Sequence, residues 1–243
     1  MWFVARWSPL PSRRLVITGT GTGVGKTIVT AAVAAVAAAD GQSVTVVKPA
    51  QTGVEPGDES DADVIRRLAG IESVYELVRY DAALAPASAA RKAGVATTSV
   101  ADLAVRISAL PAADLLLVEG AGGLLVRLDD NGGTVTDIAQ SLDADVLVVA
   151  PAGLGTLNAA ALTAEALRTR NLACAGVVIG AWPTEPGIAE TSNLIDLPGY
   201  AMAPLLGAIP ADAGRRPQDE FHAIARASLS PELGGTWQPA LVG

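Results

Sequence analysis

The 243-residue sequence predicts a single α/β domain with a mostly parallel, doubly wound sheet flanked by helices. Short runs of β-type apolar residues alternate along the chain with longer segments of helical pattern. Several of the runs are continuously hydrophobic, which is typical of strands that helices cover on both faces. Residues 1–13 precede the first run and are expected to form a loose extension, so that 14–243 make up the domain.

The expected elements follow one another in alternation. The predicted strands are 15–18, 44–47, 115–118, 146–150, 176–179 and 206–209. The predicted helices are 26–39, 60–69, 98–109, 157–170, 187–197 and 217–228. In such sheets ligands bind beyond the carboxyl ends of the strands, so the residues that follow each strand are the candidates for function.

Composition excludes several classes of protein. A formal net charge of −8 argues against binding to nucleic acid or to an anionic membrane, because both require a basic surface. The single cysteine, Cys174, fits a reducing, cytoplasmic compartment, and in its apolar run it is expected to pack rather than react. The apolar start of the chain is too short for a signal peptide. The alanine-rich segment 27–39 is too short to cross a membrane and is better explained as a buried helix.

The first predicted strand leads into Gly19-Thr-Gly-Thr-Gly-Val-Gly-Lys-Thr27 and then into a helix. Strand, glycine loop, Gly-Lys-Thr and helix in this order predict a phosphate-binding loop of the P-loop NTPase type. Its backbone N–H groups and the helix N-terminus would face the phosphates. Lys26 can reach the outer phosphates, and the Thr27 hydroxyl can hold Mg²⁺. The spacing is unusual, because the standard loop would have glycine at Thr20 and here Gly19 comes one residue early.

A lysine follows the second predicted strand, in Lys48-Pro-Ala-Gln-Thr-Gly53. Pro49 is expected to stop the strand and to leave Lys48 pointing outward at its carboxyl end. Beside a triphosphate, a second ammonium group would neutralise charge on a second, anionic reactant. The alternative is an ordinary solvated surface lysine.

Carboxylates occur at two places that suit a metal. Glu119 follows the apolar run 115–118, as in a Walker B strand, and would complete the oxygen shell of Mg²⁺ directly or through water. Asp114 lies at the entering end of the same strand and is not a candidate. Asp61 and Asp63 open a predicted helix, where first-turn carboxylates and an N-cap are also explained by helix capping.

Later loops carry weaker signals. The helix start Gly153-Leu-Gly-Thr-Leu-Asn158 could bind an anion such as a carboxylate, or could simply be capped by Thr156. The loop 180–187 follows a strand at a place where purine-reading residues often lie. His222 is expected on a surface helix without a partner, as a bystander.

Four segments in this order resemble the dethiobiotin synthetase family: GTGTGVGKT at 19–27, KPAQTG at 48–53, VEGAGG at 118–123 and LGTLNAAALT at 154–163. The resemblance extends from about residue 15 to residue 210. The phosphate loop of that family is one residue longer than the standard loop, so the early Gly19 fits.

The resemblance implies a magnesium-dependent ligase of biotin biosynthesis that uses ATP or another nucleoside triphosphate. It would carboxylate 7,8-diaminopelargonate with CO₂ through a carbamate and a carbamic–phosphoric anhydride, and release dethiobiotin, nucleoside diphosphate and phosphate. It further implies a cytoplasmic homodimer with each active site at the subunit interface, and no role for nucleic acid or membrane.

The resemblance also implies roles for individual residues. Lys26 and Lys48 would be catalytic, and the metal ligands would be Thr27, Asp61 and Glu119, with Asp63 left open as the alternative to Asp61. The nucleotide would be bound by Gly23, Val24, Gly25, Lys26, Thr27 and Gly180. The diamine would be bound by Thr22, Lys48, Thr52, Glu119, Gly122, Gly155, Thr156, Leu157 and Asn158.

The sequence departs from the family at three places. Gly180 stands where members that read adenine have an asparagine, so a weakened preference for ATP is expected. Gly23 replaces an acidic residue of some members, and 183–200 has no evident match to the family's tail-binding tyrosine.

Two other classes are weighed against this one. A ParA/MinD-like switch ATPase would carry an extra lysine at position 21, which is glycine here, and the tail 228–243 is no basic amphipathic helix. An amidotransferase-related ligase would need a glutaminase domain, for which the chain is too short.

Overall fold

The computed structural model describes residues 13–55 and 57–238, so most of the predicted N-terminal extension lies outside the described residues. One sheet of seven parallel strands in the order β3-β2-β4-β1-β5-β6-β7 forms its centre, which confirms the predicted fold class. The strands are β1 (Arg13–Gly19), β2 (Val44–Thr52), β3 (Val74–Tyr80), β4 (Leu115–Gly123), β5 (Asp145–Ala150), β6 (Cys174–Trp182) and β7 (Leu205–Pro210). The α-helices are α1 (Lys26–Ala39), α2 (Asp61–Ala69), α3 (Pro86–Ala93), α4 (Val100–Ser108), α5 (Val135–Leu142), α6 (Thr156–Thr169), α7 (Ile188–Ala201) and α8 (Gln218–Ser228).

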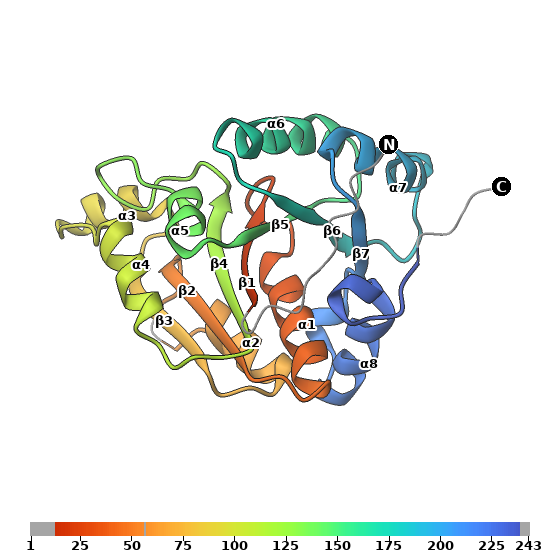
Figure 1. Cartoon of the computed structure of the whole chain (residues 1–243), viewed down its shortest axis with the longest axis horizontal. Coiled ribbons are helices and arrows are strands. Elements are labelled where there is room, and N and C mark those ends of the chain that lie inside the picture. Colours follow the sequence, from red (N-terminus) through yellow and green to blue (C-terminus); the bar gives the residue numbers. More distant parts are fainter. Residues whose placement is uncertain (1–12, 56, 239–243) are drawn as a thin grey trace.

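Helices cover both faces of the sheet (Figure 1). One apolar cluster packs α1, α2 and α8 on one face, and a second packs α4, α5, α6 and α7 on the other. In β1, Leu15 and Ile17 belong to the first cluster while Val16 belongs to the second. Both faces of the central strands are therefore apolar, which explains their continuously hydrophobic sequence.

One of the two edge strands of the sheet, β3, was not predicted. Strand β3 pairs with β2 alone and is followed by the short helix α3; both elements, and also α5, are absent from the sequence prediction. Most of β3 is only half-buried, and its Arg79 pairs with Glu76 across 2.5 Å. An edge strand of this kind lacks the apolar run by which the inner strands were found.

Three strands run well past their predicted carboxyl ends. The expectation that Pro49 stops β2 was wrong, because the strand continues to Thr52. Pairing with β3 passes from Lys48 to Ala50, and pairing with β4 ends at Val47, so the missing N–H of the proline breaks no ladder. β4 likewise runs past Glu119 to Gly123, and β6 runs past the predicted loop start to Trp182. No helix in the described part of the chain is both long and apolar enough to cross a membrane.

Candidate active site

The loop 19–25 joins the central strand β1 to α1. Gly23 and Gly25 have φ of 74° and 94°, a left-handed conformation that favours glycine. α1 begins at Lys26 without a side-chain cap, so its first backbone N–H groups are left for an anion. The loop predicted from the sequence is therefore in the strand-to-helix position that phosphate binding requires.

Lys26 turns back into this loop. Its Nζ donates a hydrogen bond to the carbonyl oxygen of Gly21 at 3.2 Å, and the residue is buried. Burial, and next the ammonium group of Lys48, lower the pKa of Lys26, while Glu119 and Asp61 oppose this in part. A desolvated cation therefore lies at the centre of the loop, where it can meet an anion with little competition from water.

Lys48 is the centre of a buried ionic cluster. Its Nζ lies 2.5 Å from Oδ2 of Asp61 and 2.7 Å from Oε1 of Glu119, and it donates to the Gly120 carbonyl at 3.4 Å. Lys48 is 4% exposed and Glu119 is 0% exposed, so the expectation that Lys48 points outward was wrong. Burial alone would lower the pKa of Lys48, but the charges and hydrogen bonds of Glu119 and Asp61 outweigh it and raise the pKa.

The hydroxyl of Thr27 joins the same two carboxylates. Its Oγ1 lies 3.0 Å from Oδ1 of Asp61 and 3.0 Å from Oε1 of Glu119. Burial opposes the ionised form of Asp61, yet Lys48, Thr27 and Lys26 together lower its pKa. Two ammonium groups thus face two carboxylates, and the cluster is locally neutral within an acidic protein.

The structure distinguishes Asp61 from Asp63, the two aspartates that the sequence left as alternative metal ligands. Asp61 is the first residue of α2 and faces Lys48, whereas Asp63 accepts hydrogen bonds from the backbone and side chain of Ser60. Asp63 also pairs with Arg66 at 2.9 Å, so its carboxylate caps the helix and turns away from the cluster.

The oxygen-bearing side chains around Lys48 suit Mg²⁺. Across the described residues, no three His, Cys, Asp or Glu side chains form a metal-binding group. Thr27, Asp61 and Glu119 nevertheless converge, and Oε2 of Glu119 is buried without a hydrogen-bond partner among the described atoms. Mg²⁺ is commonly held by one or two carboxylates and completed by phosphate oxygens and water, which is the donor set that these residues offer.

Gln51 supports the cluster and was not singled out in the sequence analysis. Its side chain is buried, Oε1 accepts a hydrogen bond from the backbone N–H of Asp61 at 3.3 Å, and Nε2 donates to the Thr52 carbonyl. The residue lies inside the segment 48–53 that the sequence singled out, but an amide there gives no chemical signal of its own.

Glycines of β4 lie against the phosphate loop. Gly122 has φ of 67°, and a Cβ there would lie 3.3 Å from Oγ1 of Thr22 and 2.9 Å from Val126. A Cβ at Gly123 would lie 3.7 Å from Gly21. Thr22 is exposed and Thr52 is half-buried at the end of β2, so both hydroxyls are available at the carboxyl edge.

Gly180 has a packing role that the sequence did not reveal. It lies within β6, and a Cβ there would be 2.0 Å from the Val24 carbonyl oxygen and 3.0 Å from Cα of Gly25. A side chain at this position would require the phosphate loop to shift. Any contact that Gly180 makes with a nucleotide is therefore a contact of its backbone.

The start of α6 has no side-chain cap. Gly155, with φ of 88°, is the N-cap, and Thr156 is the first helical residue. The alternative that Thr156 caps the helix was wrong, because its buried Oγ1 has no hydrogen-bond partner among the described atoms. Leu157 and Asn158 complete the first turn, which no side chain caps.

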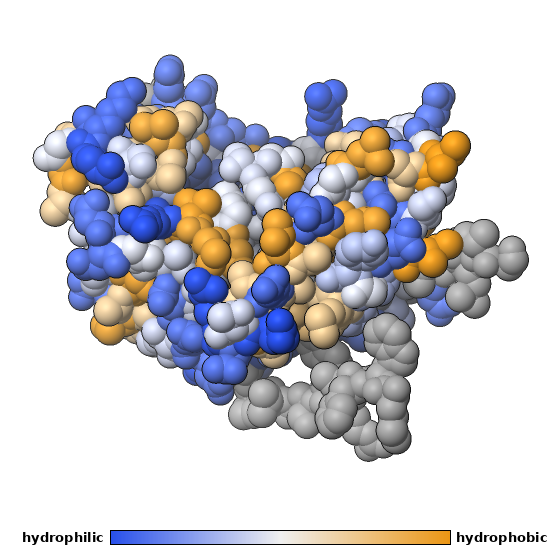
Figure 2. Space-filling view, turned by 90° about the horizontal axis from the view of Figure 1, so that it is seen from above, coloured by the Kyte–Doolittle hydropathy of each residue, from blue (hydrophilic) through white to orange (hydrophobic). Residues whose placement is uncertain are grey.

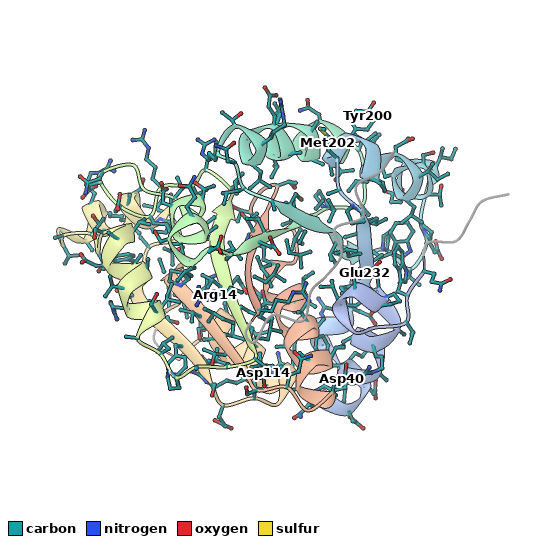
Figure 3. The ribbon with its side chains drawn as sticks, in the orientation of Figure 1. Arg14, Asp40, Asp114, Tyr200, Met202 and Glu232 are labelled. Atoms are coloured by element: carbon teal, nitrogen blue, oxygen red, sulfur yellow. The ribbon has the colours of Figure 1, made fainter. Side chains whose placement is uncertain are left out.

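The predicted bystanders lie away from the cluster. Asp114 immediately precedes β4, at the opposite end of this strand from Glu119, and accepts hydrogen bonds from the backbone and hydroxyl of Ser43 (Figure 3). His222 does have a partner, contrary to expectation, because its Nε2 lies 3.1 Å from the Leu68 carbonyl and so links α8 to α2. Cys174 is half-buried, and burial raises its pKa to about 11.

Comparison with known proteins gives a consistent result. The family model described as an AAA domain matches residues 13–218. The chain is 59% identical over 226 residues to the ATP-dependent dethiobiotin synthetase BioD of Streptomyces avermitilis, covering 92% of this chain and 94% of the relative. It is 55% identical to the BioD of a Parafrankia strain, covering 93% of this chain and 95% of the relative.

Solved structures agree on the fold. The septum site-determining protein MinD of Pyrococcus horikoshii superimposes with a TM-score of 0.56 over 88% of this chain and 93% of that chain, at 18% identity. The cell division ATPase MinD of Pyrococcus furiosus gives a TM-score of 0.53 at 19% identity, over 88% of this chain and 95% of that chain. At such identities the likeness concerns the fold alone. The much closer sequence relatives show that the chain belongs to the family of ATP-dependent dethiobiotin synthetases.

Proposed function

We propose that this protein is a dethiobiotin synthetase that closes a urea ring on 7,8-diaminopelargonate with CO₂ and a nucleoside triphosphate. The observation that supports this proposal most strongly is the cluster in which the buried Lys48 lies between Asp61 and Glu119 beside the phosphate loop. A ligase that joins two anionic reactants, a carbamate and a triphosphate, needs ammonium groups where they meet, and Lys26 and Lys48 supply two of them. The names of the relatives support the same reaction.

In this proposal each group of the chain has a distinct task. The N–H groups of the loop and of α1, with Lys26, bind the phosphates. Thr27, Asp61 and Glu119 would hold Mg²⁺, which supplies charge neutralisation and alignment of the terminal phosphate when it is bound. Lys48 binds the carbamate and stabilises the transferred phosphoryl group. No general base is required for the attack, because the carbamate is already an anionic nucleophile; positioning and charge perform the catalysis.

The diamine would lie along the edge formed by Thr22, Thr52 and Gly122. The carbamate oxygen attacks the γ-phosphorus, the bond from that phosphorus to the bridging oxygen breaks, and nucleoside diphosphate leaves. The second amine then attacks the carbonyl carbon of the anhydride, and phosphate leaves as the ring closes. The aliphatic tail of the substrate ends in a carboxylate, and the free first turn of α6 is proposed to bind it.

We also propose a homodimer in which that first turn faces the active site of the second copy. Exposed apolar side chains of α6, of the loop before it and of the end of α7 support this arrangement: Leu154 is 92% exposed, Leu162 59% and Met202 73%. Figure 2 shows hydrophobic groups on the face seen from above, and Figure 3 places Tyr200 and Met202 at the upper edge. Exposed apolar side chains that lie together on one face of a protein commonly mark an interface.

One assay tests the reaction. Purified protein is supplied with diaminopelargonate, bicarbonate, Mg²⁺ and a panel of nucleotides, and both phosphate and dethiobiotin are measured. Phosphate release that depends on the diamine supports the proposal. Release that depends instead on DNA, lipid or a protein partner would favour a switch ATPase of the MinD type.

The dimer is tested separately by sedimentation. Leu162→Asp is expected to convert the protein to monomers and to abolish turnover. Val105→Asp, which alters an exposed apolar residue of α4, serves as the matched control and should leave the dimer intact. A monomeric wild-type protein with full activity would refute the shared active site.

A further inference from the structure

A buried amide lies on the inner face of α7. Asn193 is 5% exposed, and its Nδ2 donates hydrogen bonds to the carbonyl oxygens of Ala152 at 2.7 Å and Gly153 at 3.2 Å. The buried residues of α7 are Asn193, Leu197 and Ala201, which recur every four residues and form its inward stripe. An apolar residue would complete this stripe, so the amide needs a different explanation.

The two carbonyls belong to the loop that joins β5 to α6. The Gly153 carbonyl also accepts a hydrogen bond from the N–H of Thr156 at 3.3 Å, so the same oxygen connects Asn193 to the first residue of the helix. On its α7 side the loop is close-packed, because a Cβ at Gly153 would lie 3.1 Å from Oε1 of Glu190. The direction in which α6 starts is therefore set from α7.

The start of α6 carries two independent marks of a ligand site. Its N–H groups lack a side-chain cap, and the hydroxyl of Thr156, on a residue that is 1% exposed, has no hydrogen-bond partner among the described atoms. A buried hydroxyl without a partner costs free energy unless a ligand supplies one. Helix N–H groups and a hydroxyl together suit a carboxylate.

We infer that Asn193 is a positioning residue that fixes the start of α6 in the geometry that binds the tail carboxylate of the diamine. Asn193 does not touch the substrate in this inference; it acts through Ala152 and Gly153. The inference rests on the proposed function, because it assigns the carboxylate to the ligase's own substrate. Its two hydrogen bonds satisfy both protons of the amide nitrogen, which explains why an amide is buried there.

The experiment compares two substrates on each enzyme. One is diaminopelargonate, and the other is the analogue in which a methyl group replaces the tail carboxylate. Asn193→Ala removes the donor, Asn193→Asp keeps the shape but cannot donate, and Ser192→Ala on the exposed face of the same helix is the control. Steady-state kinetics give kcat and KM for each pair.

Both Asn193 variants are expected to raise KM for diaminopelargonate by about tenfold or more, with kcat within about twofold. The reason is that a misplaced start of α6 loses a charge-assisted hydrogen bond to the tail carboxylate, and one such bond is worth about that factor or more. Turnover of the carboxylate-free analogue should change by less than about twofold. Because each protein is compared with itself on two substrates, partial loss of folded enzyme cancels. Ser192→Ala should match the wild type on both.

Two outcomes would overturn the inference. An equal loss on both substrates would show that Asn193 only stabilises the fold, and unchanged KM values would show that it positions nothing. A wild-type enzyme that turns over the diamine but treats both substrates alike would also refute it, while leaving the ligase function in place. A wild-type protein that forms no dethiobiotin would instead refute the proposed function itself.

Discussion

The phosphate-loop edge and the start of α6 are both proposed to bind anions, yet they are built from different groups. At the loop, Lys48 is paired with Asp61 and Glu119 beside Lys26, and both lysines and Glu119 are buried while Asp61 is partly exposed. At α6, the donors are backbone N–H groups and one buried hydroxyl, held by an amide on α7. The difference follows the chemistry: charged side chains are used where charge moves during the reaction, and neutral donors suffice for a carboxylate that stays unchanged.

The comparison predicts that removing one charge at the loop has the largest effect. Lys48→Ala should lower kcat by about a thousandfold or more, as loss of a cation that stabilises phosphoryl transfer does, with nucleotide affinity changed only a few-fold. Lys92→Ala, at an exposed position of α3, is the matched control and should behave as the wild type. Turnover and nucleotide binding by calorimetry check this. Lost nucleotide affinity with otherwise normal turnover would show that the role of Lys48 is assigned wrongly.

The same lysine should also matter for stability. Lys48→Met leaves two carboxylates without their shared cation, and breaking a buried ion pair in this way typically costs about 3–5 kcal/mol of unfolding free energy. Mg²⁺ should recover part of the loss, because it can take over the neutralisation of Asp61 and Glu119. Denaturant unfolding with and without Mg²⁺ measures both effects. A variant as stable as the wild type without Mg²⁺ would contradict the tight coupling of the cluster.

Stability should depend on pH at both ends of the scale. The pKa of Asp61 is lower in the folded protein, so its stabilisation is present above the ordinary value of 3.8 and is lost as the pH falls through the folded pKa. The pKa of Lys48 is raised, so its stabilisation is present below 10.5 and is lost as the pH rises through the folded pKa.

Asp61→Asn is the variant that tests this dependence. The difference in unfolding free energy between wild type and variant should be constant between about pH 5 and 9 and shrink outside that range. Asp63→Asn, which loses a helix cap, is the comparison for a carboxylate outside the cluster. A wild-type advantage that does not shrink as the pH falls below 3.8 would contradict the role given to Asp61.

Nucleotide choice should be affected less strongly. Because Gly180 offers no side-chain amide to an adenine edge, the preference for ATP over other nucleoside triphosphates should be below about 100-fold, or roughly 2.7 kcal/mol. Competition between ATP, GTP, CTP and UTP in the dethiobiotin assay measures it. A preference of 100-fold or more would place base recognition elsewhere in the chain.

Cys174 should show the smallest effect. Burial raises the pKa of its thiol to about 11, so little thiolate exists at neutral pH. Alkylation of the native protein at pH 7.5 should be slow compared with that of the unfolded chain, and Cys174→Ser should keep full activity. Rapid native alkylation with loss of turnover would contradict this.

Local sequence patterns were enough to predict six of the seven described strands and the residues that form the buried cluster. Apolar runs located β1, β2, β4, β5, β6 and β7, and glycine spacing located the phosphate loop, because both signals are local. Lys48, Asp61 and Glu119 were singled out as residues beside strands or at a helix start. The resemblance to a family then assigned them roles that no local pattern could supply.

Which of these groups meet depends on the way in which the sheet is assembled. β2 and β4 are adjacent although Lys48 and Glu119 lie 71 residues apart, so the ion pair depends on the strand order. The same order allows β2 to continue through Pro49, and capping of α2 sends Asp61 inward and Asp63 outward. The role of Asn193 could not be predicted from the sequence for the same reason, because the carbonyl groups that its buried amide contacts belong to a distant segment of the chain. Local patterns record what each segment prefers, whereas the contacts between distant segments arise only when the sheet brings them together.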